Sequence, residues 1–240
     1  DSVGNVTLCG LFNGTADFDP GIGVYNLVSN GAEDIFYARL DTIGELIFAN
    51  SIGSSLSDGA NSVSINSKGN GYITGYFNET VDFDPGAGTA YLTSAGNTDI
   101  FVYMFDTSGN YVYAKSMGGT SEEKGNGIAI SNKGRLYTTG YFNGTADFDP
   151  GSGLTELTAN SSDIFIAALV SPDISITGNA LTINSGDITP SLADNTDLGM
   201  VCPNQPSTQI FNIQNTGSAI INITSVDISG SGASYFSAIN

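Results

Sequence analysis

Short apolar segments separated by polar, Gly-containing stretches run along most of the chain, and several of them alternate between apolar and polar residues. Residues 61–66 (Asn-Ser-Val-Ser-Ile-Asn) alternate strictly, which is typical of a strand with one buried face. Residues 35–40 and 71–77 combine apolar and aromatic residues, which also favours strands. No stretch shows a 3.6-residue apolar period bounded by helix caps. The pattern therefore predicts an all-β protein without a helix longer than one turn.

One segment of the sequence occurs three times, at residues 10–23, 75–88 and 140–153, and each occurrence contains Asp-Phe-Asp-Pro-Gly. Successive occurrences start 65 residues apart, and a fixed period of this length indicates one supersecondary unit repeated in tandem. Strands are predicted in the first full period, counted from Asp34, at residues 35–40, 45–50, 61–66, 71–77 and 89–93. The same elements return after Asp99, and a third period begins at Asp163. Four antiparallel strands per repeat are typical of propeller blades, so we expect an open, partial β-propeller with two full and two partial repeats in residues 1–170.

The residue pattern changes near Pro172, which cannot donate a hydrogen bond to a strand ladder and marks the expected boundary between domains 1–170 and 171–240. From residue 173 onwards there is no Lys or Arg. Short strands are predicted at 174–176, 181–183, 209–213 and 220–224, with a hairpin turn at Thr216 and Gly217. This pattern favours a small β-sandwich, but such a domain uses roughly 100 residues. The sandwich is therefore expected to be incomplete and C-terminally truncated.

The charge balance narrows the classes of partner. The 240 residues include 24 acidic and 6 basic side chains, a net charge of −18, so a basic face for nucleic acid or an anionic membrane is not expected. A chain with this net negative charge attracts cations instead. No run of about 18 apolar residues exists that would insert into a membrane as a helix. The two cysteines, Cys9 and Cys202, are expected as free thiols, with a disulfide as the alternative in an oxidising compartment.

Residues that carry enzyme chemistry are sparse in this sequence. The chain has no His, which excludes histidine-based catalytic triads and histidine metal sites, and it has no phosphate-binding Gly-rich loop opening a helix. Paired carboxylates, which glycosidases use, occur once per repeat. A catalytic group is normally assembled once per fold, whereas a residue present in every repeat serves the repeat. We therefore expect no enzyme activity from these residues.

The Asp-Phe-Asp-Pro-Gly segment has two interpretations. In the first it is a type II turn with Pro and Gly at its centre, an Asp bonded to the backbone, and Phe18, Phe83 and Phe148 pointing inward. In the second it is a cation site, because an extended chain places Thr and both Asp side chains on one face, and Ca²⁺ suits oxygen ligands. The turn is the favoured interpretation, and a partly buried pair would need either a cation or several N–H donors. The candidate metal ligands are Asp17, Asp19, Asp82, Asp84, Asp147 and Asp149.

Two family resemblances cover most of the chain. Residues 99–102, 109–118, 134–142 and 144–148 resemble the bacterial β-propeller repeat family known as SBBP, and this resemblance covers residues 1–170. It implies a secreted or cell-surface protein of Gram-negative bacteria and no common enzymatic activity. Residues 174–178, 187–191, 197–199 and 211–217 are similar to Ig-like domains of the HYDIN/ASPM type, found in bacterial proteins labelled "choice-of-anchor D". Such domains act as spacers or docking modules.

Composition and resemblance together favour one function over two others. The favoured function is a non-enzymatic interaction or adhesion scaffold, extracellular or on the outer cell surface, whose partners are proteins or glycans. The first alternative is a calcium-dependent carbohydrate-binding module. The second is an accessory region of a secreted hydrolase whose catalytic part lies outside these residues.

Overall fold

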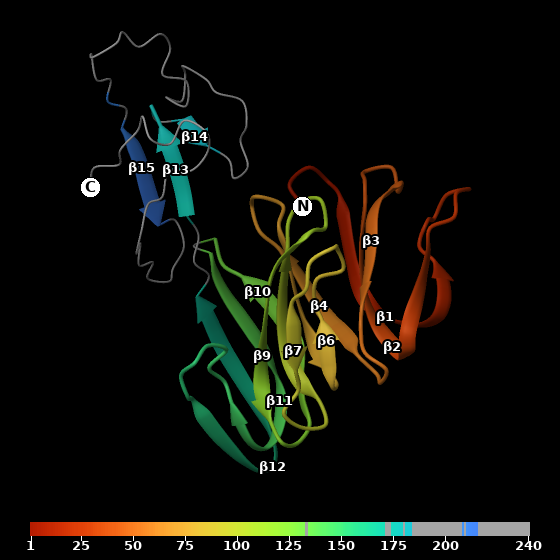
Figure 1. The fold of residues 1–240 in the computed structure, drawn as a ribbon, viewed down its shortest axis with the longest axis vertical. Coiled ribbons are helices and arrows are strands. Elements are labelled where there is room, and N and C mark those ends of the chain that lie inside the picture. The colour runs from red at the N-terminus through yellow and green to blue at the C-terminus, as the bar shows by residue number, and fades with distance from the viewer. Residues whose placement is uncertain (133, 171–173, 180, 184–207, 209, 216–240) are drawn as a thin grey trace. The chain divides into compact units, whose positions relative to one another are not determined.

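The structure, a computed structural model, describes residues 1–132, 134–170, 174–179, 181–183, 208 and 210–215 (Figure 1). Every regular element in these ranges is a β-strand, so the prediction of an all-β protein is confirmed for the described residues. The described ranges also contain no helix long and apolar enough to cross a membrane. The chain divides into two compact parts, Asp1–Leu169 and Val170–Asn240.

The N-terminal part contains three repeats of one strand pattern. The middle one, repeat 2, is a four-stranded antiparallel meander with one short hairpin inserted between its second and third strands. In pairing order its strands are β4 (Gly59–Ile65), β5 (Gly71–Phe77), β8 (Asp99–Phe105) and β9 (Tyr111–Gly119). Repeat 1 consists of β1 (Val6–Asp17), β2 (Asn26–Leu40) and β3 (Leu46–Ile52), and repeat 3 of β10 (Glu123–Ile130), β11 (Arg135–Asp147) and β12 (Glu156–Val170).

A boundary between sheets falls between β3 and β4, because β1, β2 and β3 form a sheet of their own. The predicted repeat, counted from Asp34, therefore spans two sheets: it contains β2 and β3 of this sheet and β4 and β5 of the next. The predicted strands are present, but the predicted starting point of the period lies inside a sheet. In repeat 2 the sheet begins at Gly59 instead.

The segment with Asp-Phe-Asp-Pro-Gly extends the hairpin between two successive strands of each repeat. In repeat 1, β1 and β2 shift register between Asn13 and Thr15 and pair again as far as Asp17 and Asn26. In repeat 2 the same hairpin forms two separate short strands, β6 (Thr80–Asp82) and β7 (Tyr91–Thr93). The backbone before this hairpin is left-handed, with φ values of 71° at Gly14 and 63° at Gly144. Glu79 holds the equivalent position in repeat 2 with a φ of 53°, where a side chain is strained.

Repeats 2 and 3 together form a nearly closed, barrel-like sheet with the strand order β10-β11-β9-β8-β5-β4. The strands β11 and β9 pair only through Ala146 with Gly119 and Asp147 with Gly118. The two ends of the path, β4 and β10, lie against each other. The backbone N–H groups of Ile128 and Ile130 donate to the hydroxyls of Ser62 and Ser64 there, at 3.2 and 3.3 Å. The gap between β4 and β10 is therefore bridged by side chains rather than by strand pairing.

The strands at the centre of repeat 2 are buried on both faces. Ile73, Phe101 and Tyr103 pack in one apolar cluster with residues of repeat 1, among them Ile35 and Tyr37. On the opposite face, Tyr72, Ile100 and Val102 pack in a second cluster with residues of repeat 3, which include Ile128, Leu136, Phe142 and Phe165. Burying one such side chain contributes about 1.5–3 kcal/mol. The contacts between neighbouring repeats are therefore the main apolar cores of the N-terminal part.

Two buried polar side chains of repeat 1 form hydrogen bonds with repeat 2. The hydroxyl of Tyr37 is 2.8 Å from that of Tyr103 and donates to the carbonyl of Gly109 at 2.9 Å. The guanidinium of Arg39 donates to the carbonyls of Thr107 (3.1 Å) and Gly69 (2.8 Å), and it lies over the rings of Phe48 and Phe105. Because these bonds are directional, they fix how the two sheets are placed against each other.

In the C-terminal part, the described strands form a three-stranded antiparallel sheet. It pairs in the order β14 (Leu181–Ile183), β13 (Ile174–Gly178) and β15 (Phe211–Asn215). The strands predicted at 174–176 and 181–183 are present, and the one predicted at 209–213 is displaced by two residues. The predicted strand at 220–224, the turn at Thr216 and Gly217, Pro172 and Cys202 lie outside the described residues. Cys9 is a half-buried free thiol whose burial raises its pKa to about 11.

Candidate functional site

The first candidate site is the hairpin tip formed by Asp-Phe-Asp-Pro-Gly. In repeat 2, the Oδ1 atom of Asp82 accepts hydrogen bonds from the backbone N–H groups of Asp84 (3.1 Å) and Ala90 (2.7 Å). Asp17 and Asp147 accept two equivalent bonds each, at 2.8 to 3.0 Å. These bonds lower the pKa of Asp17, mainly through the N–H of Tyr25, and of Asp147, mainly through the N–H of Thr155. The first Asp of the motif therefore closes the hairpin.

The second Asp of the motif makes the turn itself. The Oδ1 atom of Asp84 accepts the backbone N–H of Gly86 at 2.8 Å, which is an Asx turn. The type II turn predicted here is wrong, because it requires a left-handed φ at the Gly after Pro, and none of Gly21, Gly86 and Gly151 has one. A Cβ atom on Gly88 would lie 2.2 Å from the Oδ2 atom of Asp84, so a larger residue there would displace this carboxylate.

The Phe of the motif points inward, as predicted. Phe83 and Phe148 are 0% and 8% exposed, and Phe18 is partly buried. Each ring packs edge-on against the aromatic ring six residues before it, with centroid distances of 5.3 Å for Phe12–Phe18, 5.4 Å for Phe77–Phe83 and 5.1 Å for Phe142–Phe148. The hairpin tip is thereby anchored to the sheet that carries it.

The six candidate metal ligands therefore have a structural role in the turn. The Oδ1 atoms of Asp17, Asp82 and Asp147 each accept two backbone N–H groups, and those of Asp19, Asp84 and Asp149 accept one. The first Asp of each pair thus has the N–H donors that the sequence argument named as the alternative to a cation. No group of three or more Asp, Glu, Cys or His side chains able to hold a metal occurs within the described ranges. Calcium binding by these Asp residues stays a prediction.

The second candidate site consists of buried carboxylate pairs that the sequence reasoning missed. Between repeats 2 and 3, Asp99 at the start of β8 is 4% exposed and Glu123 at the start of β10 is 0% exposed. Both lie against the end of β9. The backbone N–H of Gly119 donates to the Oε2 atom of Glu123 at 2.8 Å, and a Cβ atom on Gly118 would lie 2.5 Å from the Cγ atom of Asp99.

The same arrangement occurs between repeats 1 and 2. Asp34 and Asp58 are 2% and 0% exposed and lie against the chain just after β3. The backbone N–H and the hydroxyl of Ser54 both donate to the Oδ2 atom of Asp58, at 2.6 and 2.8 Å. A Cβ atom on Gly53 would lie 2.3 Å from the Cγ atom of Asp34. We call Asp34, Asp58, Asp99 and Glu123 the junction carboxylates.

Burial changes the acidity of the junction carboxylates. The Oδ1 atoms of Asp34 and Asp99 and the Oε1 atom of Glu123 are buried without a hydrogen-bond partner in the described structure. Burial raises the pKa of Asp99 to about 6. Burial, together with the charge of Asp99, raises the pKa of Glu123 to about 7. Burial also raises the pKa of Asp34 and Asp58, and the charge of Asp34 adds to the shift of Asp58. The pair between repeats 2 and 3 therefore takes up protons near neutral pH.

A weak signal in the sequence marks these residues. Asp34 and Asp99 are 65 residues apart, and so are Asp58 and Glu123. An acidic residue at the start of an apolar strand is unusual, but its burial depends on segments that pack against it in the folded chain. Asp163, the third-period counterpart of Asp99, is exposed.

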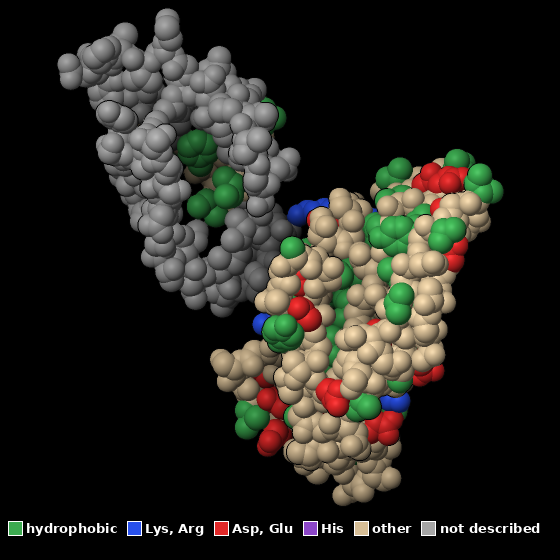
Figure 2. Space-filling model, turned by 45° about the vertical axis from the view of Figure 1, so that its right-hand side comes forward, with side chains coloured by type: hydrophobic (Ala, Val, Ile, Leu, Met, Phe, Trp, Pro, Cys, Tyr) green, Lys and Arg blue, Asp and Glu red, His purple; other side chains and the backbone are tan. Residues whose placement is uncertain are grey.

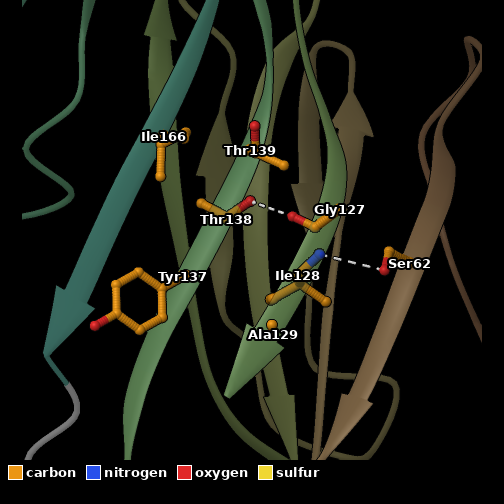
Figure 3. Close-up of a pocket in the computed structure, with 8 residues that line it drawn as sticks. All are labelled: Ser62, Gly127, Ile128, Ala129, Tyr137, Thr138, Thr139 and Ile166. Atoms are coloured by element: carbon orange, nitrogen blue, oxygen red, sulfur yellow. Dashed lines mark hydrogen bonds between the residues drawn. The ribbon is translucent and has the colours of Figure 1, made fainter. Parts of the chain in front are cut away.

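The third candidate site is a pocket of about 340 Å³ lined by β10, β11 and β12 of repeat 3 and by Ser62 on β4 of repeat 2 (Figure 3). Its lining residues are Ser62, Gly127, Ile128, Ala129, Tyr137, Thr138, Thr139 and Ile166. Tyr137 and Ile166 are 39% and 77% exposed, and no charged side chain lines the pocket. An uncharged surface of this kind suits an apolar partner rather than an ionic ligand or a bond-breaking reaction.

Known proteins assign no function to the hairpin tips, the junction carboxylates or this pocket. Neither a protein-family model nor a curated protein matches the chain. The geometry of the three sites is therefore the basis on which a function is proposed.

Proposed function

We propose that this chain is a non-enzymatic interaction or adhesion scaffold, located outside the cell or on its outer surface. The observation that supports it most is how the recurring polar residues are used. The paired Asp residues of the hairpin tips accept backbone N–H groups, and the junction carboxylates are buried between repeats. What the N-terminal part offers a partner is therefore a rigid repeat array with exposed apolar strand faces.

The proposal includes a finer description of the fold. Repeats 1, 2 and 3 are taken as blades of an open β-propeller of the SBBP type, and the C-terminal part as an Ig-like spacer. The four-stranded meander β4-β5-β8-β9 supports the blade assignment, because propellers repeat such units around a centre. The close approach of β4 and β10 also supports it, since the first strands of neighbouring blades meet at that centre.

The main alternative is a calcium-dependent carbohydrate-binding module. It is favoured by the same Asp pair standing at three equivalent hairpin tips, where Ca²⁺ with oxygen ligands would be repeated three times. The acidic side chains spread over the visible face of the described part would also attract cations (Figure 2). A third possibility is an accessory role beside a catalytic region outside these residues.

An array experiment separates the scaffold from the carbohydrate module. The full chain is applied to arrays of glycans and of extracellular proteins, in calcium and in EDTA, together with the variants Asp82→Asn/Asp84→Asn and Asp106→Asn. Asp106 is the matched control, because it caps the turn between β8 and β9 through the N–H groups of Ser108 and Asn110. The scaffold predicts binding that survives EDTA and both sets of substitutions. Glycan binding that EDTA abolishes and that only the Asp82/Asp84 variant loses would establish the carbohydrate module instead.

A further inference from the structure

The outward face of repeat 3 has the residues that repeat 2 uses to contact its neighbour. Repeat 2 packs Tyr72, Ile100 and Val102 against repeat 3, and these side chains are 3%, 0% and 0% exposed. The equivalent residues of repeat 3 are Tyr137, Ile164 and Ile166, which are 39%, 81% and 77% exposed. We call these three residues, with Thr139, the tail face. Its residues have the chemistry of a covered interface, and the pocket in Figure 3 lies on it.

The outward face of repeat 1 is the complementary surface. Repeat 3 packs Leu136, Phe142, Phe148 and Phe165 against repeat 2. At the equivalent positions, repeat 1 has Val6, Phe12, Phe18 and Phe36. Val6 is 51% exposed, and Leu8, at the position of Thr138 in repeat 3, is 45% exposed. We call these five residues of repeat 1 the head face.

The aromatic part of the head face already has the geometry of a contact surface. The rings of Phe12 and Phe18 are 5.3 Å apart, and those of Phe18 and Phe36 are 4.9 Å apart. In repeat 3 the corresponding distances are 5.1 Å for Phe142–Phe148 and 4.8 Å for Phe148–Phe165, and there repeat 2 covers the rings. The head face would therefore need little rearrangement to accept a partner.

We propose that the tail face of one chain binds the head face of a second copy of the same chain, in the way that repeat 2 binds repeat 3. The chain itself shows which surface covers each face, because repeats 1 and 2 and repeats 2 and 3 make the same kind of contact. A head-to-tail contact leaves one free face of each kind at the two ends of the assembly. The assembly therefore grows into a ring or a filament rather than stopping at a symmetric dimer.

This inference rests on the repeat geometry and does not depend on the proposed scaffold function. The net charge of −18 repels two copies at long range, while the tail face has no charged residue. Association is therefore expected to strengthen as salt concentration rises, the opposite of what an interface held by ion pairs would show.

Two variants that each block one face test the proposal. Ile166→Glu places a charge on the tail face, and Leu8→Glu places one on the head face. Ile43→Glu is the matched control, because Ile43 is 82% exposed in the turn between β2 and β3 and lies on neither face. Mass is measured by sedimentation and light scattering of the full chain up to millimolar concentration, and near-ultraviolet circular dichroism checks that each variant is folded.

The proposal predicts different masses for the separate variants and for their mixture. The parent and Ile43→Glu rise in mass with concentration, while Ile166→Glu and Leu8→Glu each stay at the 24.7 kDa of one chain. An equimolar mixture of the two blocked variants forms dimers of twice that mass and nothing larger, because only one unblocked face of each kind remains. A parent that stays monomeric at every concentration and salt level overturns the proposal. So does a mixture that stays monomeric, or a blocked variant that associates as the parent does.

Discussion

Replacing Glu123 by Gln should stabilise the protein at alkaline pH and not at acidic pH. The carboxylate is fully buried beside Asp99, and only one of its two oxygen atoms has a hydrogen-bond partner in the described structure. The amide of Gln keeps an oxygen for the N–H of Gly119 and carries no charge. It also removes the repulsion between this carboxylate and the charge of Asp99.

The magnitude follows from the pKa of the parent residue. Burial raises the pKa of Glu123 from its ordinary value of 4.5 to about 7, and that of Asp99 from 3.8 to about 6. One pKa unit corresponds to about 1.4 kcal/mol, so the charged form of Glu123 costs at most about 3.5 kcal/mol of unfolding free energy. Solvent at the partly exposed neighbours Gly118 and Gly119 screens this charge, and we expect a net gain of about 1–2 kcal/mol from the substitution at pH 8.

The direction of the pH dependence follows from the same shifts. A carboxyl group with a raised pKa in the folded state binds its proton more tightly there than in the unfolded chain. Its contribution to stability is therefore complete below its ordinary pKa and is lost as pH rises through the folded value. For Asp99 and Glu123, the parent should lose stability between about pH 4 and pH 7.

Urea unfolding at a series of pH values provides the measurement. Tyrosine fluorescence is the suitable signal, because the chain has 11 Tyr and no Trp. The control is Glu122→Gln, since bonds from Tyr141 and Lys124 lower the pKa of Glu122, and the substitution should not stabilise at pH 8. Buffers contain EDTA, so that bound cations do not mask the effect. If Glu123→Gln is less stable than the parent at pH 8, or keeps the full slope of the parent between about pH 4 and pH 7, the reasoning about the junction carboxylates is wrong.

Three further predictions concern single features of the N-terminal part. Glu79→Gly should raise the unfolding free energy by about 0.5–1 kcal/mol in urea, because Glu79 has the left-handed φ that Gly adopts without strain; an unchanged or lower value would contradict this. Arg39→Met should lower stability by about 1–3 kcal/mol, because it leaves two backbone carbonyls without their donor, and a loss of only a few tenths would show that water replaces the guanidinium. If the hairpin tips bind calcium, millimolar CaCl₂ should raise the melting temperature of the parent but not of Asp82→Asn/Asp84→Asn, and EDTA should reverse the shift. A melting temperature that calcium leaves unchanged would establish the motif as a turn alone.

The strands could be predicted from the sequence because their signals are local. Alternation at residues 61–66 and aromatic content at 71–77 each depend on one strand only, and both segments are strands in the structure. The period of 65 residues was also visible, but a periodic sequence has no marked beginning. The boundary between β3 and β4 depends on which strands exchange hydrogen bonds, so the period alone could not locate it.

The candidate sites were only partly predictable. The Asp residues at the hairpin tips stood out because the motif repeats, and the inward position of Phe83 followed from its place in the turn. The turn type was wrong because the expectation relied on Pro and Gly, whereas the carboxylate of Asp84 forms the turn. The junction carboxylates were missed because the burial of Asp99 depends on segments packed against it, among them Gly118 at the end of β9, and local sequence does not show them. Asp163, at the equivalent position of repeat 3, is exposed.

The burial of β8 on both faces has a consequence for how the chain folds. A sheet whose two faces are both apolar gains little by forming alone, since each face is stabilised only when a neighbouring sheet arrives. Stability should therefore depend on how many sheets are stacked, as in linear arrays where each unit interacts only with its neighbours. During synthesis, the face of β5 and β8 that packs against repeat 3 would stay exposed to solvent until β10 and β11 have left the ribosome. The large negative charge of the chain would help to keep such half-covered intermediates apart.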